Sequence, residues 1–397
     1  MSRIFLGAFG DPGHAFPMLA LGTELVARGH RVRLQTWSQW EAATTSAGIE
    51  FAGAPEYQVF PTRERPLKPY AAAVPAASET RPQIRDFGAD VAVSDILTPA
   101  PALAAELEAV PVATVVPHVF PWLPPGFAPY SIGARLPRTP IGRALWRRTD
   151  GLIARGLEQG RSEFNECRSR LGLPALPFVH TALSRDLTLI ATLPQLEYPR
   201  DWPSWTRIVG PLLWEPPGRG ADPPPGSDPV VLVAPSTSQD PERSLLRAAL
   251  EGLASARVRM IASWNGPLDP AVEVPGNAVV VPWLSYAATM PRCDLVLCHG
   301  GHGTLARALV SGCPAVICPA GGDMAENAAR ADRLGLGVRL PRRYGSARGV
   351  RLAVERALGR PSLRTRAAAV ARWAAAHDGP ATAADEIEAW IERLGRG

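Results

Sequence analysis

Short apolar runs alternate with amphipathic, helix-length stretches in two separate parts of the chain. Each part repeats the order apolar run, helical pattern, apolar run: residues 4–8, 14–28 and 32–36 in the first part, and residues 230–234, 241–255 and 257–262 in the second. This alternation is typical of parallel strands joined by helices that cover both faces of a sheet. It predicts an α/β protein with two Rossmann-like, doubly wound domains. Ligands bind such folds at the carboxyl ends of the strands, so we expect the site in a cleft across which the two domains face each other.

A segment with neither pattern separates the two parts. Residues 214–229 read WEPPGRGADPPPGSDP, and so many prolines favour an extended, irregular backbone. At 397 residues the chain is long enough for two domains of average size. We therefore expect an N-terminal domain over residues 1–213, a linker over 214–229, a C-terminal domain over 230–379, and a capped amphipathic helix within 380–397.

Two stretches of the first domain are less regular. Residues 57–81 are rich in proline, alanine and charge, which predicts a long loop beside the cleft. Residues 117–146 combine prolines with aromatic side chains, among them Phe120 and Trp122. These aromatic residues suit two interpretations equally well: packing against the core, or lining a pocket for a flat hydrophobic molecule.

Charge and hydropathy narrow the classes of function. The chain has 42 basic and 37 acidic residues, a net charge of +5, and the two signs are interleaved along the sequence. This pattern argues against a nucleic-acid-binding face, although a modest positive field can attract an anionic ligand. No apolar run reaches the roughly 18 residues of a membrane span, and the first residues lack the pattern of a signal peptide. We expect a cytoplasmic protein that does not insert into membranes.

The cysteines point to a reducing compartment. There are five, an odd number, none with Cys-x-x-Cys spacing, and most lie in or beside apolar runs. Cysteines at such positions act more often as small core residues than as metal ligands. We therefore expect no disulfide framework and no metal site.

A glycine-rich turn after one apolar strand carries the most specific chemistry. Residues 295–298 form the strand, and His299-Gly300-Gly301-His302-Gly303-Thr304 leads into a helix. Glycine lets the backbone approach a ligand, and the first N–H groups of a helix have no internal partners and favour an anion. A second apolar run, residues 313–318, brings Asp323 to the same edge. A diphosphate at the turn and a carboxylate for sugar hydroxyls together indicate a nucleotide sugar.

The segment over residues 283–327 resembles the donor-binding signature of the family 1 nucleotide-sugar glycosyltransferases, which have the GT-B fold. In that family a tryptophan stacks on the nucleobase, a His-Gly-Gly-x-Gly-Thr turn holds the diphosphate, and an Asp-Gln pair holds sugar hydroxyls. A small hydroxyl residue near the diphosphate and a last helix that crosses back to the first domain are also family features. The resemblance implies these donor-binding residues: Ser236, Thr237, Trp283, His299, Gly301, Gly303, Thr304, Asp323 and Met324. Ser236 and Thr237 suit equally well the role of caps for the helix that begins near residue 241.

Three departures from the family pattern remove polar contacts to a donor. Ser285-Tyr286 stands where the family has Pro-Gln, Arg307 where it has a glutamate for the ribose, and Met324 where it has the glutamine. A thioether packs well against an apolar deoxy position. We therefore expect a donor other than UDP-glucose, for example a deoxyhexose on thymidine diphosphate. His302 occupies the variable position of the turn and is expected to face solvent.

The first apolar run leads into a helix that begins near His14. A helix N-terminus disfavours the imidazolium, which predicts a neutral His14 that can accept a proton. Asp95 follows a strand at residues 90–94 and is suited to hold the other ring nitrogen, although it also suits the N-cap of the next helix. In the resembling family the catalytic base is a histidine at this place with an acidic partner, so we favour a catalytic His14–Asp95 pair. The expected acceptor-binding residues are Gly13, His118, Phe120 and Trp122.

Together these residues predict an inverting, metal-independent glycosyltransferase that moves a sugar from a nucleoside diphosphate to a hydrophobic small molecule of secondary metabolism, such as an antibiotic. It needs no cofactor beyond the nucleotide sugar as co-substrate, and we expect a monomer or homodimer. Two alternatives stay open: a nucleotide-sugar epimerase of the same fold, and a non-catalytic nucleotide-sugar-binding helper protein. The presence of both His14 and Asp95 disfavours the helper, because a binder has no use for a base.

Overall fold

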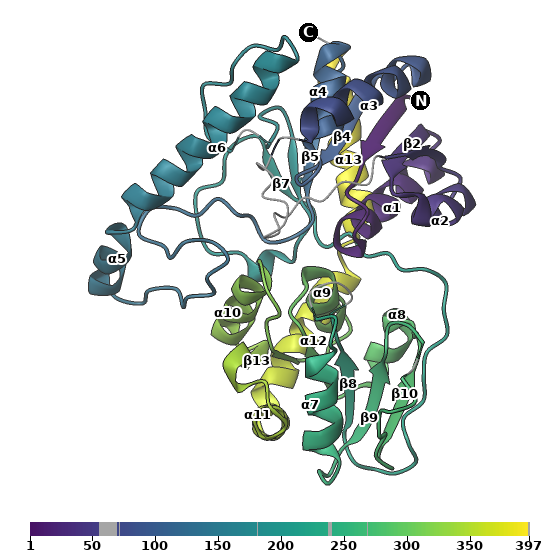
Figure 1. The fold of residues 1–397 in the computed structure, drawn as a ribbon, viewed down its shortest axis with the longest axis vertical. Helices are drawn as coiled ribbons and strands as arrows, with labels where there is room; N and C mark the ends of the chain where they lie inside the picture. Colours follow the sequence, from purple (N-terminus) through teal and green to yellow (C-terminus); the bar gives the residue numbers. More distant parts are fainter. Residues whose placement is uncertain (55–69, 71, 181, 237–239, 268, 396–397) are drawn as a thin grey trace.

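Two parallel β-sheets form the frame of the computed structural model of the protein (Figure 1). The structure describes residues 1–54, 70, 72–180, 182–236, 240–267 and 269–395. The first sheet has seven strands in the order β3-β2-β1-β4-β5-β6-β7, and the second has six in the order β10-β9-β8-β11-β12-β13. Neighbouring strands pair in parallel in both sheets. The predicted α/β architecture of two doubly wound domains is confirmed.

The first half of the chain builds the seven-stranded sheet. Its strands are β1 (Arg3–Gly7), β2 (Arg31–Thr36), β3 (Glu50–Gly53), β4 (Val91–Asp95), β5 (Val112–Val116), β6 (Thr188–Ile190) and β7 (Thr206–Ile208). Its helices are α1 (Pro12–Ala27), α2 (Glu41–Ser46), α3 (Ala73–Phe87), α4 (Pro99–Leu107), α5 (Pro140–Arg147) and α6 (Asp150–Arg170), with the short 3-10 turns η1 (Ser38–Trp40) and η2 (Pro194–Leu196). The central strands are apolar along their whole length because helices cover both of their faces. On β1, for example, Leu6 packs toward α1 while Phe5 packs on the other face against α3.

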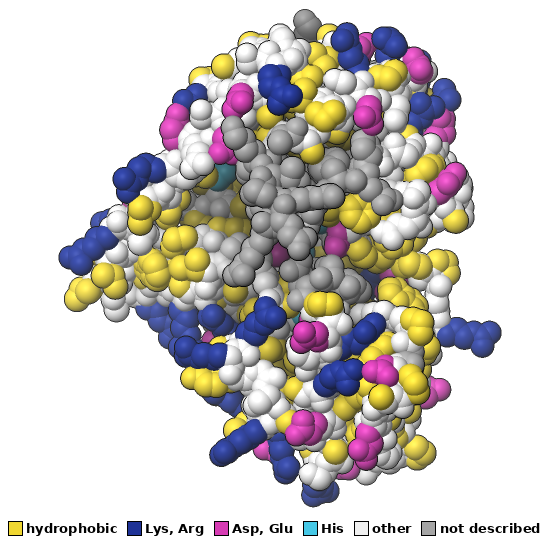
Figure 2. Space-filling model, viewed as in Figure 1, with side chains coloured by type: hydrophobic (Ala, Val, Ile, Leu, Met, Phe, Trp, Pro, Cys, Tyr) yellow, Lys and Arg dark blue, Asp and Glu magenta, His cyan; other side chains and the backbone are white. Residues whose placement is uncertain are grey.

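The second half builds the six-stranded sheet. Its strands are β8 (Val230–Ala234), β9 (Arg259–Ser263), β10 (Ala278–Val281), β11 (Leu295–Cys298), β12 (Ala315–Ile317) and β13 (Gly337–Arg339). Its helices are α7 (Ser244–Leu253), α8 (Tyr286–Thr289), α9 (His302–Val310), α10 (Met324–Leu334), α11 (Ala347–Leu358) and α12 (Pro361–Ala375), with the 3-10 turns η3 (Met290–Arg292) and η4 (Arg342–Tyr344). The two sheets occupy separate lobes of the molecule in Figure 1. On the face drawn in Figure 2, basic and acidic side chains are interspersed over both lobes.

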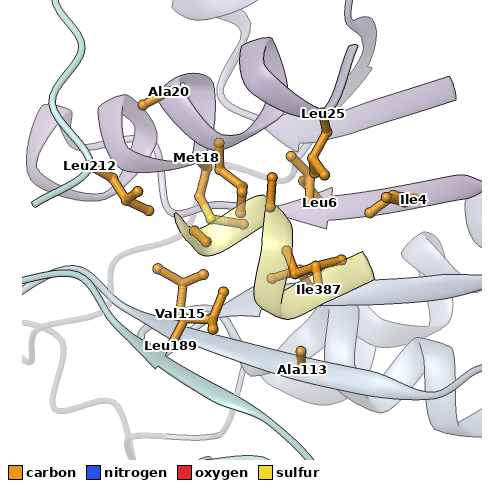
Figure 3. Close-up of a cluster of buried hydrophobic side chains, with 14 of the residues drawn as sticks. Ile4, Leu6, Met18, Ala20, Leu25, Ala113, Val115, Leu189, Leu212 and Ile387 are labelled. Atoms are coloured by element: carbon orange, nitrogen blue, oxygen red, sulfur yellow. The ribbon is translucent and has the colours of Figure 1, made fainter. Parts of the chain in front are cut away.

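The last helix, α13 (Gly379–Leu394), leaves the second lobe and packs against α1 of the first. Its buried residues Ala383, Ala384, Ile387 and Trp390 belong to the same apolar cluster as Met18 of α1. Figure 3 shows Ile387 beside side chains of β1, β5, β6 and α1. The core of the first lobe is therefore completed by residues that follow the whole second lobe in sequence.

Helix α3 corrects the long loop that we expected over residues 57–81. Residues 73–81 form its first turns, and its buried positions Ala73, Ala76, Ala77, Thr80 and Ile84 follow a helical spacing. The alanine and charge content that suggested a loop is that of a helix with one small-residue face. The remainder of the predicted loop, residues 57–69 and 71, lies outside the described residues.

The segment between β7 and β8 contains no helix or strand, as its proline content requires. It is nevertheless held to the second lobe at several points. Glu215 accepts hydrogen bonds from the Ser285 hydroxyl and from the Ala287 N–H, and Arg292 pairs with Asp222 at 2.6 Å. The segment therefore forms part of the surface of the second lobe.

The order of the strands determines where the two lobes meet a ligand. The chain leaves β1 on one side toward β2 and β3 and returns to β4 on the other, and β8 and β11 are related in the same way. Such switch points open a crevice at the carboxyl ends of the two central strands. The register sets Gly7 opposite Ser94 in the first sheet and Ala234 opposite Cys298 in the second. The turns after these strands therefore lie side by side at the two facing edges.

Candidate active site

A cavity of about 530 Å³ lies between the two lobes at these strand ends. Both lobes contribute to its walls, the first mainly through the turn after β1 and the second mainly through α9 and the turn before α10. Most of the residues expected at the site line it, among them Gly13, His14, His118, Trp283, His299, Gly303, Thr304 and Asp323. Ser236, Gly301 and Met324 also line it.

His14 and Asp95 come together at the first switch point. His14 lies in the first turn of α1, and Asp95 is the last residue of β4, which neighbours β1. His14 Nδ1 lies 2.8 Å from Asp95 Oδ1, and the second carboxylate oxygen accepts from the Phe9 N–H at 3.3 Å. Because a carboxylate accepts, Nδ1 carries the hydrogen, which leaves the lone pair of the neutral ring on Nε2.

The pKa of His14 is shifted in the direction opposite to the one we expected. Burial lowers the pKa of His14, but the charge of Asp95 and the hydrogen bond to it outweigh burial, and the pKa lies above the ordinary value of 6.5. The positive end of α1 was expected to keep the ring neutral. In the structure the paired carboxylate dominates over the helix end, because it is in direct contact. Asp11, which caps α1 by accepting from the Gly13 N–H at 3.0 Å, adds a further negative charge nearby.

Asp95 does not serve as the cap that we considered as its alternative role. The N-cap of α4 is Thr98, and no side chain makes the cap hydrogen bond there. The carboxylate of Asp95 is 1% exposed and is taken up by His14 and the Phe9 N–H. Its burial beside a histidine ring at the cavity wall is the arrangement that orients a general base.

His118 follows β5 and lies near His14, with ring centroids 6.3 Å apart. Its Nδ1 donates to the carbonyl oxygen of Val119 at 2.9 Å, which leaves Nε2 as an acceptor. Burial lowers the pKa of His118 below 6.5, so the ring is neutral at neutral pH. A neutral His118 offers the cavity a hydrogen-bond acceptor that is distinct from the base.

Phe120 and Trp122 lie outside the cavity, contrary to their expected role as acceptor contacts. Phe120 is buried in an apolar cluster of the first lobe, and Trp122 stacks on His180 and on Trp205. Of the two interpretations offered for these aromatic residues, packing is the one that the structure supports. They extend the core instead of the pocket because the chain after His118 turns inward at Val119, which is fully buried.

Other aromatic side chains supply the apolar wall beside His14. Phe9, Phe16 and Trp214 line the cavity, and Phe16 packs edge-on against Trp214 with centroids 5.0 Å apart. We did not single them out from the sequence. Phe9 and Phe16 lie close to His14 in the sequence, between the end of β1 and the first turns of α1. The same stretch that indicated a base could therefore have predicted an apolar wall beside it.

The glycine-rich turn takes the form expected of an anion site. Gly300 has φ +91°, and a side chain there would meet Ile317 Cγ2 at 2.8 Å, while one on Gly301 would meet the His299 ring at 2.5 Å. Gly300 therefore requires glycine, and a side chain at Gly301 would displace the His299 ring. Helix α9 then begins at His302 with no side-chain cap, so its first N–H groups are available to a ligand. His299 Nδ1 donates to the Ala234 carbonyl at 3.2 Å, and burial lowers the pKa of His299.

Ser236 is buried and lines the cavity directly after β8. Thr237 lies outside the described residues. The helix that these two residues were alternatively expected to cap is α7, and its first amides are satisfied by Asp240, which accepts from the Ser244 and Leu245 N–H groups, each at 3.1 Å. The position of Ser236 therefore leaves it beside the turn that carries His299 and away from the start of α7.

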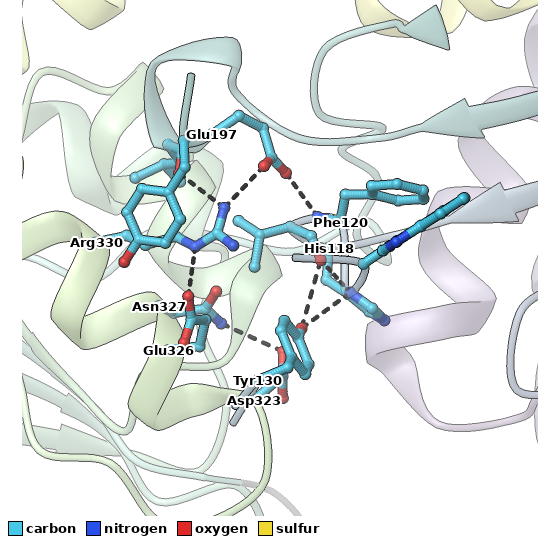
Figure 4. Close-up of polar contacts among 12 residues, drawn as sticks. His118, Phe120, Tyr130, Glu197, Asp323, Glu326, Asn327 and Arg330 are labelled. Atoms are coloured by element: carbon cyan, nitrogen blue, oxygen red, sulfur yellow. Dashed lines mark hydrogen bonds and ion pairs between the residues drawn. The ribbon is translucent and has the colours of Figure 1, made fainter. Parts of the chain in front are cut away.

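Asp323 and Met324 stand at the start of α10, against the glycine-rich turn. The Asn327 amide bridges the two, donating to the Gly300 carbonyl at 2.9 Å and to Asp323 Oδ2 at 3.3 Å (Figure 4). A side chain on Gly300 would meet Met324 Cβ at 3.2 Å. The carboxylate and the thioether are thus held at a fixed distance from the anion site.

Trp283 and Arg307 of the second lobe also line the cavity. The Trp283 side chain is 50% exposed. Arg307 lies one turn after Thr304 on α9, and burial lowers its pKa while the charge of Glu215 opposes that effect. Ser285 caps α8 by accepting from the Ala288 N–H at 3.0 Å.

His302 was expected to face solvent, and this is wrong. It is buried, it lines the cavity, and neither ring nitrogen makes a hydrogen bond among the described residues. Burial, followed by the neighbouring His118, lowers the pKa of His302 to about 4. The buried positions His302, Leu305, Ala306 and Leu309 share one face of α9, and this helical spacing was visible in the sequence.

Within the described ranges, no group of three or more His, Cys, Asp or Glu side chains is arranged to hold a metal ion. In the same ranges, no helix is long and apolar enough to cross a bilayer.

Comparison with known proteins identifies the family. The model of the C-terminal domain of erythromycin biosynthesis protein CIII-like proteins matches residues 258–390. The 4'-demethylrebeccamycin synthase of Lentzea aerocolonigenes is 29% identical, over 98% of this chain and 100% of that protein. The O-mycaminosyltylonolide 6-deoxyallosyltransferase of Streptomyces fradiae is 30% identical, over 98% of both.

A solved structure, that of the glycosyltransferase VinC in complex with DTDP, superimposes with a TM-score of 0.72 at 18% identity and covers 98% of this chain and 100% of that one. This likeness shows that the fold is GT-B. With the full-length match to the transferase of Streptomyces fradiae, it shows that the chain is an enzyme and belongs to the GT-B glycosyltransferases of antibiotic and other natural-product biosynthesis.

Proposed function

We propose that the protein transfers a sugar from a nucleoside diphosphate, with inversion and without a metal ion, to a hydroxyl of a hydrophobic small molecule in the cytoplasm, as a monomer or homodimer. The observation that carries the proposal is the His14–Asp95 pair, 2.8 Å apart, in the wall of a cavity that also receives the start of α9. A base and an anion site on facing lobes suit a reaction in which a nucleophile enters on one side and a diphosphate leaves on the other. The epimerase and helper alternatives are not favoured by the relatives.

In the proposed reaction, His14 Nε2 takes the proton of the acceptor hydroxyl as its oxygen bonds to the anomeric carbon. The bond between that carbon and the diphosphate oxygen breaks, and the diphosphate leaves with the electron pair. Asp95 stabilises the imidazolium that forms. The N–H groups at the start of α9 and the Thr304 hydroxyl receive the leaving charge. Phe9, Phe16 and Trp214 suit the hydrophobic body of an acceptor.

We further propose that the donor is a deoxyhexose on thymidine diphosphate. Met324 offers the sugar an apolar, weakly accepting surface beside Asp323, where a second polar side chain would suit a fully hydroxylated hexose. Arg307 places no acceptor near the ribose. A relative named as a 6-deoxyallosyltransferase and a structural neighbour solved with DTDP are in keeping with this donor class.

Replacement of the base tests the proposal. His14→Ala should lower turnover roughly a hundredfold to ten-thousandfold, because the acceptor oxygen would attack without deprotonation. Binding of the nucleoside diphosphate, measured by calorimetry, should be unchanged, because that ligand lies on the other lobe. Asp95→Asn should reduce turnover less than His14→Ala does. A loss of donor affinity as large as the loss of turnover would overturn the assignment of His14 as the base.

A further inference from the structure

Four buried charged side chains meet where the two lobes join, and Figure 4 shows three of them, Glu197, Glu326 and Arg330. Arg330 and Glu326 belong to α10 of the second lobe, and Glu197 and Arg200 follow η2 of the first. Each of the four side chains is at most 3% exposed. Two carboxylates and two guanidinium groups give the cluster no net charge, which is what makes its burial tolerable.

The contacts of Arg330 cross the boundary between the lobes. Its Nη1 lies 2.8 Å from Glu197 Oε2 and donates to the Leu196 carbonyl at 3.1 Å, while its Nε lies 2.9 Å from Glu326 Oε1 on the same helix. Burial opposes the charge of Arg330, but Glu197 and Glu326 outweigh burial and raise its pKa. Arg330 is thus a cation held jointly by one carboxylate from each lobe.

Glu197 also bonds to the segment that follows His118, a residue of the cavity wall. Its Oε1 accepts from the Phe120 N–H at 2.6 Å, and Phe120 lies just after His118 in the chain. Arg330 lies further along the helix that begins at Met324, immediately after Asp323. One carboxylate therefore bonds both to the segment that carries His118 and to the helix that presents Asp323 and Met324.

Apolar side chains surround the cluster. Val119, Leu193 and Leu196 of the first lobe pack into the apolar core of the second, together with Ala328 and Ala331 of α10. A shift of α10 away from the first lobe would leave Arg330 and Glu197 unpaired in this apolar setting, where an uncompensated charge is expensive. The pairing therefore opposes such a shift much more strongly than a surface ion pair would.

We propose that Glu197 is a positioning residue, which holds the sugar-binding start of α10 at a fixed distance from the acceptor side of the cavity. This inference rests on the proposed function, since it assumes that Asp323 and His118 face a sugar and its acceptor. Transfer between two bound substrates requires the reacting atoms to be about 3 to 3.5 Å apart, and a misplacement of about 1 Å can cost a hundredfold in rate. Glu197 touches neither substrate and acts through the two elements that do.

The experiment compares Glu197→Gln with Glu326→Gln. Both variants neutralise one buried carboxylate that bonds to Arg330, at 2.8 Å and 2.9 Å, but only Glu197 also bonds to the backbone of the segment that carries His118. Turnover, the dissociation constant of thymidine diphosphate and thermal unfolding are measured for both variants, with activity read at a temperature where each is folded. We expect both variants to unfold at lower temperature and to bind the diphosphate within about twofold of the wild type.

Turnover separates a positioning role from a merely structural one. Glu197→Gln should lower kcat by about tenfold or more, and Glu326→Gln should leave it within about twofold. Equal kcat values for the two folded variants would overturn the proposal. If Glu197→Gln does not fold, the double variant Glu197→Gln/Arg330→Met removes the unpaired cation and should show the same loss of kcat. If His14→Ala had the same turnover as the wild type, the proposed base would be refuted. The comparison of Glu197→Gln with Glu326→Gln would still decide the positioning role.

Discussion

At His299, one hydrogen bond fixes what the side chain can offer a ligand. Nδ1 donates to the Ala234 carbonyl, so Nε2 of the neutral ring has only a lone pair, which repels a phosphate oxygen. Burial keeps the pKa of His299 below 6.5 in the free protein. A diphosphate beside the ring must raise that pKa, because an opposite charge favours the protonated form. We therefore expect His299 to take up a proton when the donor binds.

The proton uptake makes donor affinity depend on pH. It strengthens binding fully below the pKa of His299 in the free protein, and the gain is lost as pH rises through the higher pKa of the complex, by up to about tenfold per pH unit. Calorimetry of thymidine diphosphate in buffers of different ionisation enthalpy measures the proton directly. Thymidine without phosphate is the control and should bind without uptake. His299→Gln, whose amide can donate at any pH, should remove the dependence, and an unchanged dependence in that variant would contradict the assignment.

Site residues could be predicted where the order of strands along the chain alone places them. His14 lies just after one strand of the first sheet and Asp95 ends the neighbouring strand, so their proximity was predictable from chain order alone. The direction of the His14 pKa shift was not predictable, because the direct contact with Asp95 has a larger effect than the helix N-terminus. The expected role of Phe120 could not be predicted for a similar reason. An aromatic residue suits a pocket or a core equally well, and only the path of the neighbouring backbone decides which of the two it joins.

Helix α9 is the element that sets the donor site. Its first residue follows the glycine-rich turn, and Arg307 lies one turn later on the cavity side. The anion site and position 307 are therefore separated by a fixed rise along one helix. If the diphosphate binds at the start of α9 as proposed, we expect a residue at 307 to meet the nucleoside next to it.

Arg307→Glu should shift nucleotide preference toward UDP. A carboxylate can accept from the ribose 2′-hydroxyl, which thymidine's deoxyribose lacks, and a hydrogen bond to a charged group contributes about 1.5 kcal/mol, or roughly tenfold in affinity. Competition binding of UDP against TDP measures the preference. Arg307→Gln is the matched control, because it also removes the guanidinium without adding a charged acceptor. A wild-type preference for UDP that neither variant alters would refute the thymidine-type donor and leave the transferase assignment untouched.

Among the elements, the central strands were the most predictable. Apolar runs such as residues 230–234 are buried on both faces, so the apolar positions in the sequence are also the buried positions in the structure. Helix α3 was missed because its buried face is mostly alanine, which gives little contrast in hydropathy, and because Pro82 lies within it. The ion cluster around Arg330 could not be predicted either, because its two local pairs, Glu197 with Arg200 and Glu326 with Arg330, are far apart in the chain and resemble ordinary surface charges in sequence.

The whole molecule depends on α13 for the stability of the lobe that carries His14. Ile387 is fully buried against side chains of β1, β5 and α1 (Figure 3). Ile387→Ala should lower the free energy of unfolding by about 2 to 5 kcal/mol, the usual cost of a cavity in a core. Urea denaturation measures it. Leu394→Ala on the same helix, where the side chain is 41% exposed, should cost less than about 0.5 kcal/mol. Equal losses for the two variants would show that α13 contributes helix propensity alone and does not complete this core.

During synthesis, the residues of α13 leave the ribosome only after the whole second lobe. At 5 to 20 residues per second, translation from the end of the first lobe to α13 takes about ten to thirty seconds. For that time the nascent first lobe exposes the apolar side chains that α13 later covers, among them Met18 and Leu6. We expect chaperones to bind this nascent lobe, and the enzyme to become active only once α13 has been released and has docked.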